Sequence, residues 1–290
     1  MKNFNYRIFG LFIFVIISWG IAWPINKVGL AYMSPLWYTA IRLLVGTTTM
    51  LALVLALKKF SFPKMKDLPL IFIIGLLQIS IFILLANVGL TYLPAGRSSL
   101  IAYTTPLWVM PAAILFFKEK FGLLSWLGFA LGLGGLVLLL SPWEMDWNNT
   151  DVLYGCAMLL LASLCWGVSI LCARYMQWTK SPLELIPWQL LIGTLPVLLY
   201  ASLHEPNIAI NWNTSLVLSL LYTGVLVTGM SYWVGLIINK ELPATVVSLG
   251  FLVVPVFSLA VSAIFLNEVI TLSTGTAMFA ILLGMVCIVI

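Results

Sequence analysis

Charge is the property that this sequence has least of. Only 8% of its 290 residues are charged, whereas soluble domains typically carry about 25%. Hydrophobic residues make up 62% of the chain, and the mean hydropathy is +1.12. A water-soluble fold cannot hide so much apolar surface, so the sequence predicts an all-α membrane protein whose solvent is the lipid bilayer.

Residues that carry chemistry are also scarce. His204 is the single histidine, and the four cysteines lie inside apolar runs without disulfide or metal-ligand spacing. No Asp or Glu falls in the middle of an apolar run, so a midplane carboxylate relay for ions or protons is not expected. The pattern excludes an enzyme and indicates no metal site and no cofactor. Membrane topology explains the net charge of +5 better than nucleic-acid binding does.

Ten apolar windows are long enough to cross the hydrocarbon core as helices. They cover residues 7–27, 35–57, 68–91, 94–117, 122–140, 152–173, 183–203, 214–238, 243–266 and 272–290. The first window is too long for a signal-peptide core, and we expect it to be retained as a span. Pro94 and Pro243 divide two longer runs, because proline favours the first turn of a helix.

The basic residues predict the orientation of these spans. They concentrate in segments on the N-terminal side of the membrane, such as 58–66, 118–120 and 174–180. The linkers on the other side carry acidic residues instead. By the positive-inside rule both termini are cytoplasmic, and we expect a multi-pass protein of the inner or plasma membrane.

One segment of the sequence occurs twice. "LPAGRSSLIAYTTPLWVMPAAILFFKEK" at 93–120 matches "LPATVVSLGFLVVPVFSLAVSAIFLNEV" at 242–269, with Pro106 and Glu119 in register with Pro255 and Glu268. Residues 1–140 therefore form a first five-helix repeat, and 152–290 form a second, joined by an acidic outer linker at 141–151. Because five is odd, the second repeat enters the membrane from the opposite side. Such inverted repeats are typical of secondary transporters.

The quoted segments, together with "SWGIAWPINKVGL" and "SPLWYTAIRLLVG", resemble the EamA family of the drug/metabolite transporter superfamily. The resemblance covers essentially the whole chain as two EamA units. It implies ten helices in an inverted repeat and the export of small metabolites such as amino acids. The family is broad, so the resemblance does not identify the substrate.

Aromatic and neutral polar side chains within the spans are the candidate substrate contacts. Trp19, Trp23 and Asn26 share one face of the first span. Packing between helices is the alternative role, above all for the small polar residues. The candidates are Trp19, Trp23, Gln78, Tyr103, Trp166, Ser169 and Tyr222.

Three basic residues lie in or near spans toward the outer side: Lys27, Arg42 and Arg97. Reaching out to the lipid headgroups is one interpretation for all three. The functional hypothesis is that Arg97, together with Lys27, attracts a carboxylate or another anionic group of the substrate.

Two further pairs come from the repeat. Pro106 and Pro255 lie in mid-span and are either hinges or static bends. Glu119 and Glu268 are expected to accept hydrogen bonds from free amides at a helix N-terminus.

These features predict a secondary transporter that exports small organic metabolites, amino acids or related solutes first among them, by alternating access. A flippase for a lipid-linked sugar or another amphiphile is one alternative and requires a lateral opening between helices. A non-transporting membrane scaffold is the other, and a central cavity of a few hundred Å3 would argue against it. The glycines of "GFALGLGG" mark close helix contacts, either between the two repeats or in a homodimer.

Overall fold

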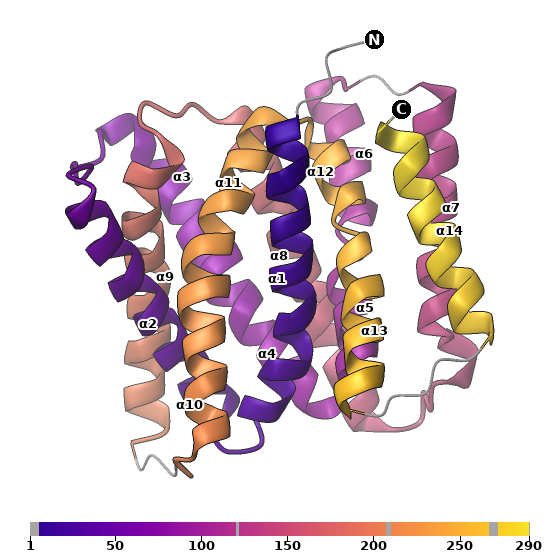
Figure 1. The fold of residues 1–290 in the computed structure, drawn as a ribbon, viewed down its shortest axis with the longest axis horizontal. Coiled ribbons are helices and arrows are strands. Elements are labelled where there is room, and N and C mark those ends of the chain that lie inside the picture. Colours follow the sequence, from indigo (N-terminus) through magenta and orange to yellow (C-terminus); the bar gives the residue numbers. More distant parts are fainter. Residues whose placement is uncertain (1–5, 120–121, 207–209, 267–271, 290) are drawn as a thin grey trace.

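The computed structural model describes residues 6–119, 122–206, 210–266 and 272–289. Every regular element in these ranges is helical (Figure 1). Within them, nine helical segments are long and apolar enough to cross a membrane. The last predicted span corresponds to α14, Leu272–Val289, with a shorter apolar stretch at Gly275–Gly284. The predicted all-α membrane fold is confirmed.

The helices follow one another in the same order in the two halves of the chain. The first half contains α1 (Tyr6–Gly29), α2 (Pro35–Ala56), η1 (Met65–Asp67), α3 (Leu68–Ile73), η2 (Ile74–Ile81), α4 (Phe82–Tyr92), α5 (Ala95–Ala102), α6 (Pro106–Phe117) and α7 (Leu123–Leu140). After η3 (Pro142–Glu144), the second half contains α8 (Thr150–Tyr175), α9 (Pro182–His204), α10 (Thr214–Leu221), η4 (Tyr222–Ser231), α11 (Tyr232–Glu241), α12 (Ala244–Gly250), α13 (Val253–Leu266) and α14.

The two faces of the helical layer are distinguished by the chain ends. In Figure 1, α1 begins and α14 ends on the same face, which we call the terminal face. The opposite face, which carries the turn between α1 and α2, is called the distal face.

Equivalent helices begin with the same Ser-Pro dipeptide. The Ser34 side chain accepts a hydrogen bond from the Trp37 amide at the start of α2. Ser181 caps α9 in the same way and forms a reciprocal capping box with Glu184. The proline that follows each serine lacks an amide hydrogen, which the first turn does not need. The Ser-Pro dipeptides therefore determine where α2 and α9 begin. One of these helices begins on each face.

Four of the crossings are not continuous α-helices. The third contains the π-helix η2 and the eighth contains the π-helix η4, at equivalent places in the two repeats. The fourth breaks at residues 103–105 and the ninth at residues 251–252. Pro106 is the first residue of α6, and Pro255 is the third residue of α13. Each proline therefore lies in the first turn after a break, where its missing amide hydrogen costs little.

Small residues bring the two repeats into close contact. The hydroxyl groups of Thr47 on α2 and Thr194 on α9 lie 2.7 Å apart. A Cβ atom on Gly193 would lie 2.6 Å from the carbonyl oxygen of Gly75, so η2 and α9 touch through their backbones. Backbone approach of this kind is how helices associate in a membrane without a hydrophobic driving force.

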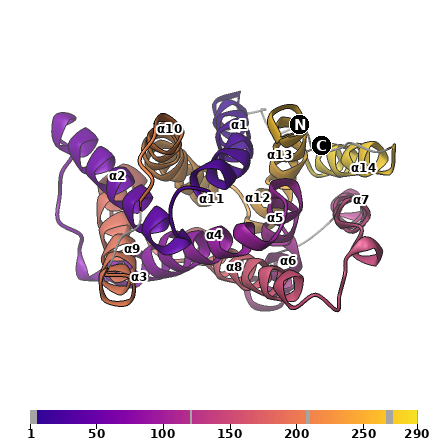
Figure 2. The same cartoon turned by 90° about the horizontal axis from the view of Figure 1, so that it is seen from below.

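The glycines of α7 pack against α14. A Cβ on Gly135 would lie 2.8 Å from the Ala277 carbonyl oxygen, and one on Gly284 would lie 2.7 Å from that of Gly128. In Figure 2 the α7–α14 pair stands at one end of the molecule. These glycines form a contact between the two repeats within one chain, so a homodimer is not needed to explain them.

Glu119 joins the two repeats on the terminal face. Its carboxylate accepts hydrogen bonds from the Ala244 amide at 3.1 Å and from the Thr245 and Tyr175 hydroxyl groups. Ala244 opens α12, so the predicted role of Glu119 at a helix N-terminus is confirmed. Its repeat partner Glu268 lies outside the described residues.

Candidate functional site

A cavity of about 40 Å3 lies between helices of the two repeats. It is lined by residues of α1, α2, α4, α8, η4 and α11 and by the break between α5 and α6. The lining consists of Trp19, Ala22, Trp23, Asn26, Arg42, Phe82, Ile83, Ala86, Asn87, Tyr103, Trp166, Val227 and Tyr232. A space of this size holds a few water molecules. We call it the central cavity.

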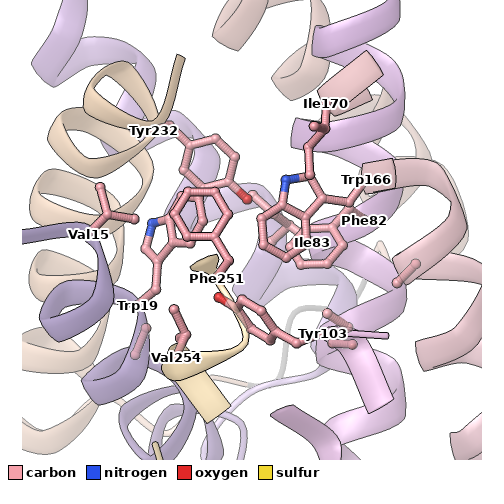
Figure 3. Packing of buried hydrophobic residues seen from close by; sticks show 14 of the residues in the cluster. Val15, Trp19, Phe82, Ile83, Tyr103, Trp166, Ile170, Tyr232, Phe251 and Val254 are labelled. Carbon is pink, nitrogen blue, oxygen red and sulfur yellow. The ribbon is translucent and has the colours of Figure 1, made fainter. Parts of the chain in front are cut away.

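Aromatic rings that line the central cavity pack together with Phe251 in one buried cluster (Figure 3). The ring centroids of Trp19 and Trp166 lie 5.4 Å apart, and Trp19 lies 5.6 Å from Tyr232. Tyr103 meets Trp166 edge-on at 5.0 Å, and Phe251 lies 5.0 Å from Trp19. Such tilted contacts are the favoured geometry for aromatic pairs. Tyr103 and Phe251 stand at the breaks of the fourth and ninth crossings, so the helix breaks place both rings in this cluster.

The two central indoles have unused hydrogen-bond donors. The Nε1 atoms of Trp19 and Trp166 are buried, and no acceptor among the described residues bonds to either of them. A buried donor without a partner costs about 1–3 kcal/mol. Native proteins rarely tolerate such groups unless a ligand or water satisfies them. In this conformation the two N–H groups therefore have no acceptor among the described residues.

Polar side chains form the other part of the cavity. Arg42 donates from Nε to the Thr228 hydroxyl at 2.8 Å and from Nη1 to Asn26 Oδ1 at 3.4 Å. Asn26 Oδ1 also accepts from the Tyr38 hydroxyl at 3.2 Å. These bonds join α1, α2 and η4, and they place a permanent positive charge at the wall of the cavity.

A family comparison identifies the architecture that holds this cavity. The sequence profile described as the EamA-like transporter family matches residues 7–141 and again 153–290. The chain belongs to the EamA-like transporter family. It is therefore a multi-pass membrane transporter, and the expectation that it is not an enzyme is confirmed by its family.

Relatives of this EamA-like transporter come from several bacteria. The "Uncharacterized transporter YvbV" of Bacillus subtilis is 28% identical and covers 96% of this chain and 90% of its own length. The "Probable amino-acid metabolite efflux pump" of Salmonella typhimurium is also 28% identical, over 90% of this chain and 87% of its own. One solved crystal structure matches with a TM-score of 0.78 over 98% of both chains; at 18% identity it shows the fold alone.

Four of the predicted contact residues meet in the central cavity of this transporter. Trp19, Trp23, Tyr103 and Trp166 all line it. Their spacing along α1 and the deep position of the tryptophans in their spans are the signals that bring them together. Lipid-interface belts do not account for aromatic rings at this depth.

The other four predicted residues lie elsewhere. Gln78 is buried in η2, and its Oε1 atom has no partner among the described residues. Ser169 donates to the Cys165 carbonyl of its own helix, and Tyr222 donates to the Ser18 carbonyl. Arg97 forms an ion pair with Glu144 at 3.7 Å on the distal face, with 36% of its side chain exposed.

The headgroup interpretation is wrong for Arg42. Its side chain is 5% exposed and turns into the protein, because Asn26 and Thr228 offer oxygen acceptors there. Helical spacing alone left the rotation of α2 undetermined. A signal was present, however, since Tyr38 and Arg42 are four residues apart and share one helix face. Asn87 and Tyr232 are further lining residues that sequence reasoning did not select.

Lys27 and Arg174 occupy equivalent positions in the two repeats. The Lys27 ammonium group donates to the Leu90 carbonyl at 2.6 Å and to the Leu93 carbonyl at 3.0 Å, at the distal end of α4. Arg174 Nη1 donates to the Lys240 carbonyl at 2.6 Å, near the terminal end of α11. A cation at a helix C-terminus stabilises the unpaired carbonyl groups there. Lys27 therefore links α1 to the end of α4 on the distal face, and Arg174 links α8 to α11 near the terminal face.

A second, larger hollow opens on the side of the molecule. This lateral groove has a volume of about 480 Å3 and an apolar lining from α1, α10, η4 and α13. Pro24, Ser219, Tyr222 and Phe265 are among its lining residues. None of its lining residues also lines the central cavity, so α1 separates the two spaces.

Proposed function

We propose that this transporter is a secondary carrier that exports small organic metabolites, with amino acids and related solutes as the first candidates. One observation carries the proposal: the central cavity is lined by both inverted repeats, and its lining includes one buried cation and two tryptophans whose indole N–H groups are unpartnered among the described residues. Inverted repeats allow the same residues to face each side of the membrane in turn. The name of the Salmonella typhimurium relative supports the choice of amino acids.

The substrate contacts are Trp19, Trp23, Tyr103 and Trp166. Aromatic faces and neutral polar groups suit an amphipathic or zwitterionic solute better than a small hydrated ion. Gln78, Ser169 and Tyr222 lie away from the present cavity. They would contact the solute when the repeats rearrange.

The cavity of about 40 Å3 is smaller than the few hundred Å3 that a bound metabolite requires. The conformation is therefore closed around the centre, and transport requires the cavity to expand. Pro106 and Pro255, each next to a helix break, are the proposed hinges. Lys27 and Arg174 would hold the distal and terminal faces closed.

The proposed orientation places both termini in the cytoplasm and the distal face outside the cell, in the inner membrane. The basic segments at 58–66 and 174–180 support it through the positive-inside rule. The ion pair between Arg97 and Glu144 would then lie on the outer face. A homodimer remains a prediction from the sequence.

Lipid flipping is the second candidate function. The lateral groove is the observation in its favour, because a flippase needs a hollow that opens toward the acyl chains. Against it, the groove is separate from the polar residues that would hold a headgroup. The scaffold alternative has no support from a family of transporters.

Counterflow in proteoliposomes tests the exporter directly. Proteoliposomes that contain the purified protein are loaded with one unlabelled solute at a time. Uptake of the same solute in labelled form is then followed without an ion gradient. Transient accumulation of an amino acid supports the proposal. If proteoliposomes with folded protein accumulate no member of a panel of amino acids, sugars and nucleotides, the proposed export function is contradicted. Fluorescent-lipid scrambling is then the next assay.

A further inference from the structure

Arg42 carries a full positive charge into the interior of the membrane-spanning helices. It lies about two turns from the start of α2, is 5% exposed and lines the central cavity. The guanidinium group does not lose its proton in proteins. A charge at this depth is costly, and it is normally paired or functional.

The protein partners of Arg42 are neutral. Thr228 Oγ1 accepts from Nε, and Asn26 Oδ1 accepts from Nη1 at the long distance of 3.4 Å. Asn26 Oδ1 is shared with the Tyr38 hydroxyl. These bonds use two of the five N–H groups of the guanidinium. Donors therefore remain for a further acceptor.

No protein carboxylate neutralises this charge in the described part of the chain. The ion pairs found there join Arg97 to Glu144 and Lys180 to Glu184. Both pairs lie outside the central cavity. The charge of Arg42 is thus not matched by a described acidic side chain.

A packing role does not require the charge. In the Thr47–Thr194 register, the residue of α9 that corresponds to Arg42 is Gln189, which is also fully buried. The second repeat therefore places a neutral amide at this position. A glutamine at position 42 would also donate to Thr228, at a lower desolvation cost. The positive charge is a special feature of the first repeat and of the cavity that it faces.

We propose that Arg42 binds a carboxylate of the transported solute, and that an apolar body of the same solute lies against the aromatic part of the cavity. The proposal rests on the proposed function of the central cavity. Arginine holds carboxylates through paired, charge-assisted hydrogen bonds. Trp23, Tyr103 and Trp166 line the same cavity and provide the aromatic surface. The substrate class is therefore an apolar or aromatic carboxylic acid, amino acids included.

This assignment differs from the one that the sequence suggested, in which Arg97 attracts the anion. Arg97 is already paired with Glu144 and lies at the distal face. It is separate from the residues that line the cavity. Arg97→Gln is therefore the matched control for Arg42→Gln, because both remove one positive charge from the first repeat.

The experiment compares acids with their amides. L-Phenylalanine and L-phenylalaninamide, 3-phenylpropionate and 3-phenylpropionamide, and L-leucine and L-leucinamide are added to purified protein in detergent, and thermal unfolding is followed. We expect an acid to raise the Tm of the wild type and its amide to raise it little. Binding of that acid to Arg42→Gln should be at least about tenfold weaker, Arg42→Lys should retain part of it, and Arg97→Gln should bind normally.

Several results would overturn the inference. They are a Tm rise that is equal for acid and amide, a rise that sodium chloride reproduces, or no rise with any acid. The acid–amide comparison uses the wild type, so the test survives even if Arg42→Gln fails to fold.

Counterflow of the same compounds separates this inference from the proposed function. If a neutral solute shows counterflow and carboxylates do not affect that counterflow, the proposed role of Arg42 is contradicted and the proposed carrier function still holds. If an acid binds in an Arg42-dependent way but shows no counterflow, the proposed carboxylate site is supported and the proposed carrier function is contradicted.

Discussion

Trp19 and Trp166 occupy equivalent positions in the two repeats and meet at the centre of the molecule, with ring centroids 5.4 Å apart and ring planes at 70°. Neither repeat can form this pair alone, because one ring comes from α1 and the other from α8. Both indole N–H groups are buried and unpartnered among the described residues. These two side chains therefore both join the repeats and line the candidate substrate site.

Replacing either indole by a ring without a donor should separate stability from transport. In Trp19→Phe and Trp166→Phe the unsatisfied N–H is removed, which offsets part of the cost of the lost ring volume. We expect a small change in Tm. Counterflow should nevertheless fall about tenfold, since a hydrogen bond to the solute is lost. Thermal unfolding and proteoliposome counterflow measure the two quantities.

Trp143→Phe is the control for both variants. Trp143 lies in η3, outside the central cavity, and is largely exposed. It should change neither Tm nor counterflow. Equal losses of transport in all three variants would show that the indole donors have no special role.

Removal of each of the two equivalent cations should loosen a different face of the molecule. Lys27→Gln weakens the attachment to residues 90–93 of the distal face, whereas Arg174→Gln weakens the attachment to Lys240 near the terminal face. Amide hydrogen exchange should rise about tenfold at residues 91–99 in the first variant and at residues 240–248 in the second. Mass spectrometry of peptic fragments measures both segments in one experiment. A rise in the same segment for both variants would contradict the assignment of one fastening to each face.

Long-range patterns made much of this fold predictable. The apolar windows require helices of membrane-spanning length, and the segments that begin at Pro94 and Pro243 reveal the repeat. Gly75 and Gly224 also repeat, but the sequence does not show that a π-helix surrounds each of them. A π-helix takes up one extra residue in a turn, and neighbouring helices decide whether this happens. The residue pattern of one span contains no information about those neighbours.

The site could be predicted in part for the same reason. Trp19 and Trp23 share a helix face, and both line the cavity. The headgroup interpretation of Arg42 is wrong because a long side chain in the first turns of a helix can turn either to the headgroups or into the protein with the same sequence. Its acceptors, Asn26 and Thr228, come from other helices. Such a choice is decided by tertiary contacts.

Glu119 should matter more for stability than an exposed glutamate. It accepts the Ala244 amide and the Thr245 hydroxyl at the start of α12, and it also accepts the Tyr175 hydroxyl. Glu119→Ala removes all three acceptor bonds, and we expect a loss of about 1–2 kcal/mol, as for an N-cap. Glu144→Ala breaks only the exposed pair with Arg97 and should cost less than about 0.5 kcal/mol. Thermal unfolding of both variants in the same detergent compares them, and an equal loss of Tm would contradict the role of Glu119 in joining the repeats.

Two adjacent glycines of α7 give a sharp test of the contact between the repeats. A Cβ on Gly135 would lie 2.8 Å from the Ala277 carbonyl oxygen and 3.1 Å from the Ile281 amide nitrogen, so Gly135→Ala forces two backbones apart. A Cβ on Gly134 meets no described atom within 4 Å, and alanine there should stabilise the helix by up to about 1 kcal/mol. The first variant should lower Tm and the second should hold or raise it. Both substitutions add one methyl group to the same helix, so each is a control for the other. A similar Tm for the two variants would show that α7 and α14 do not pack through their backbones.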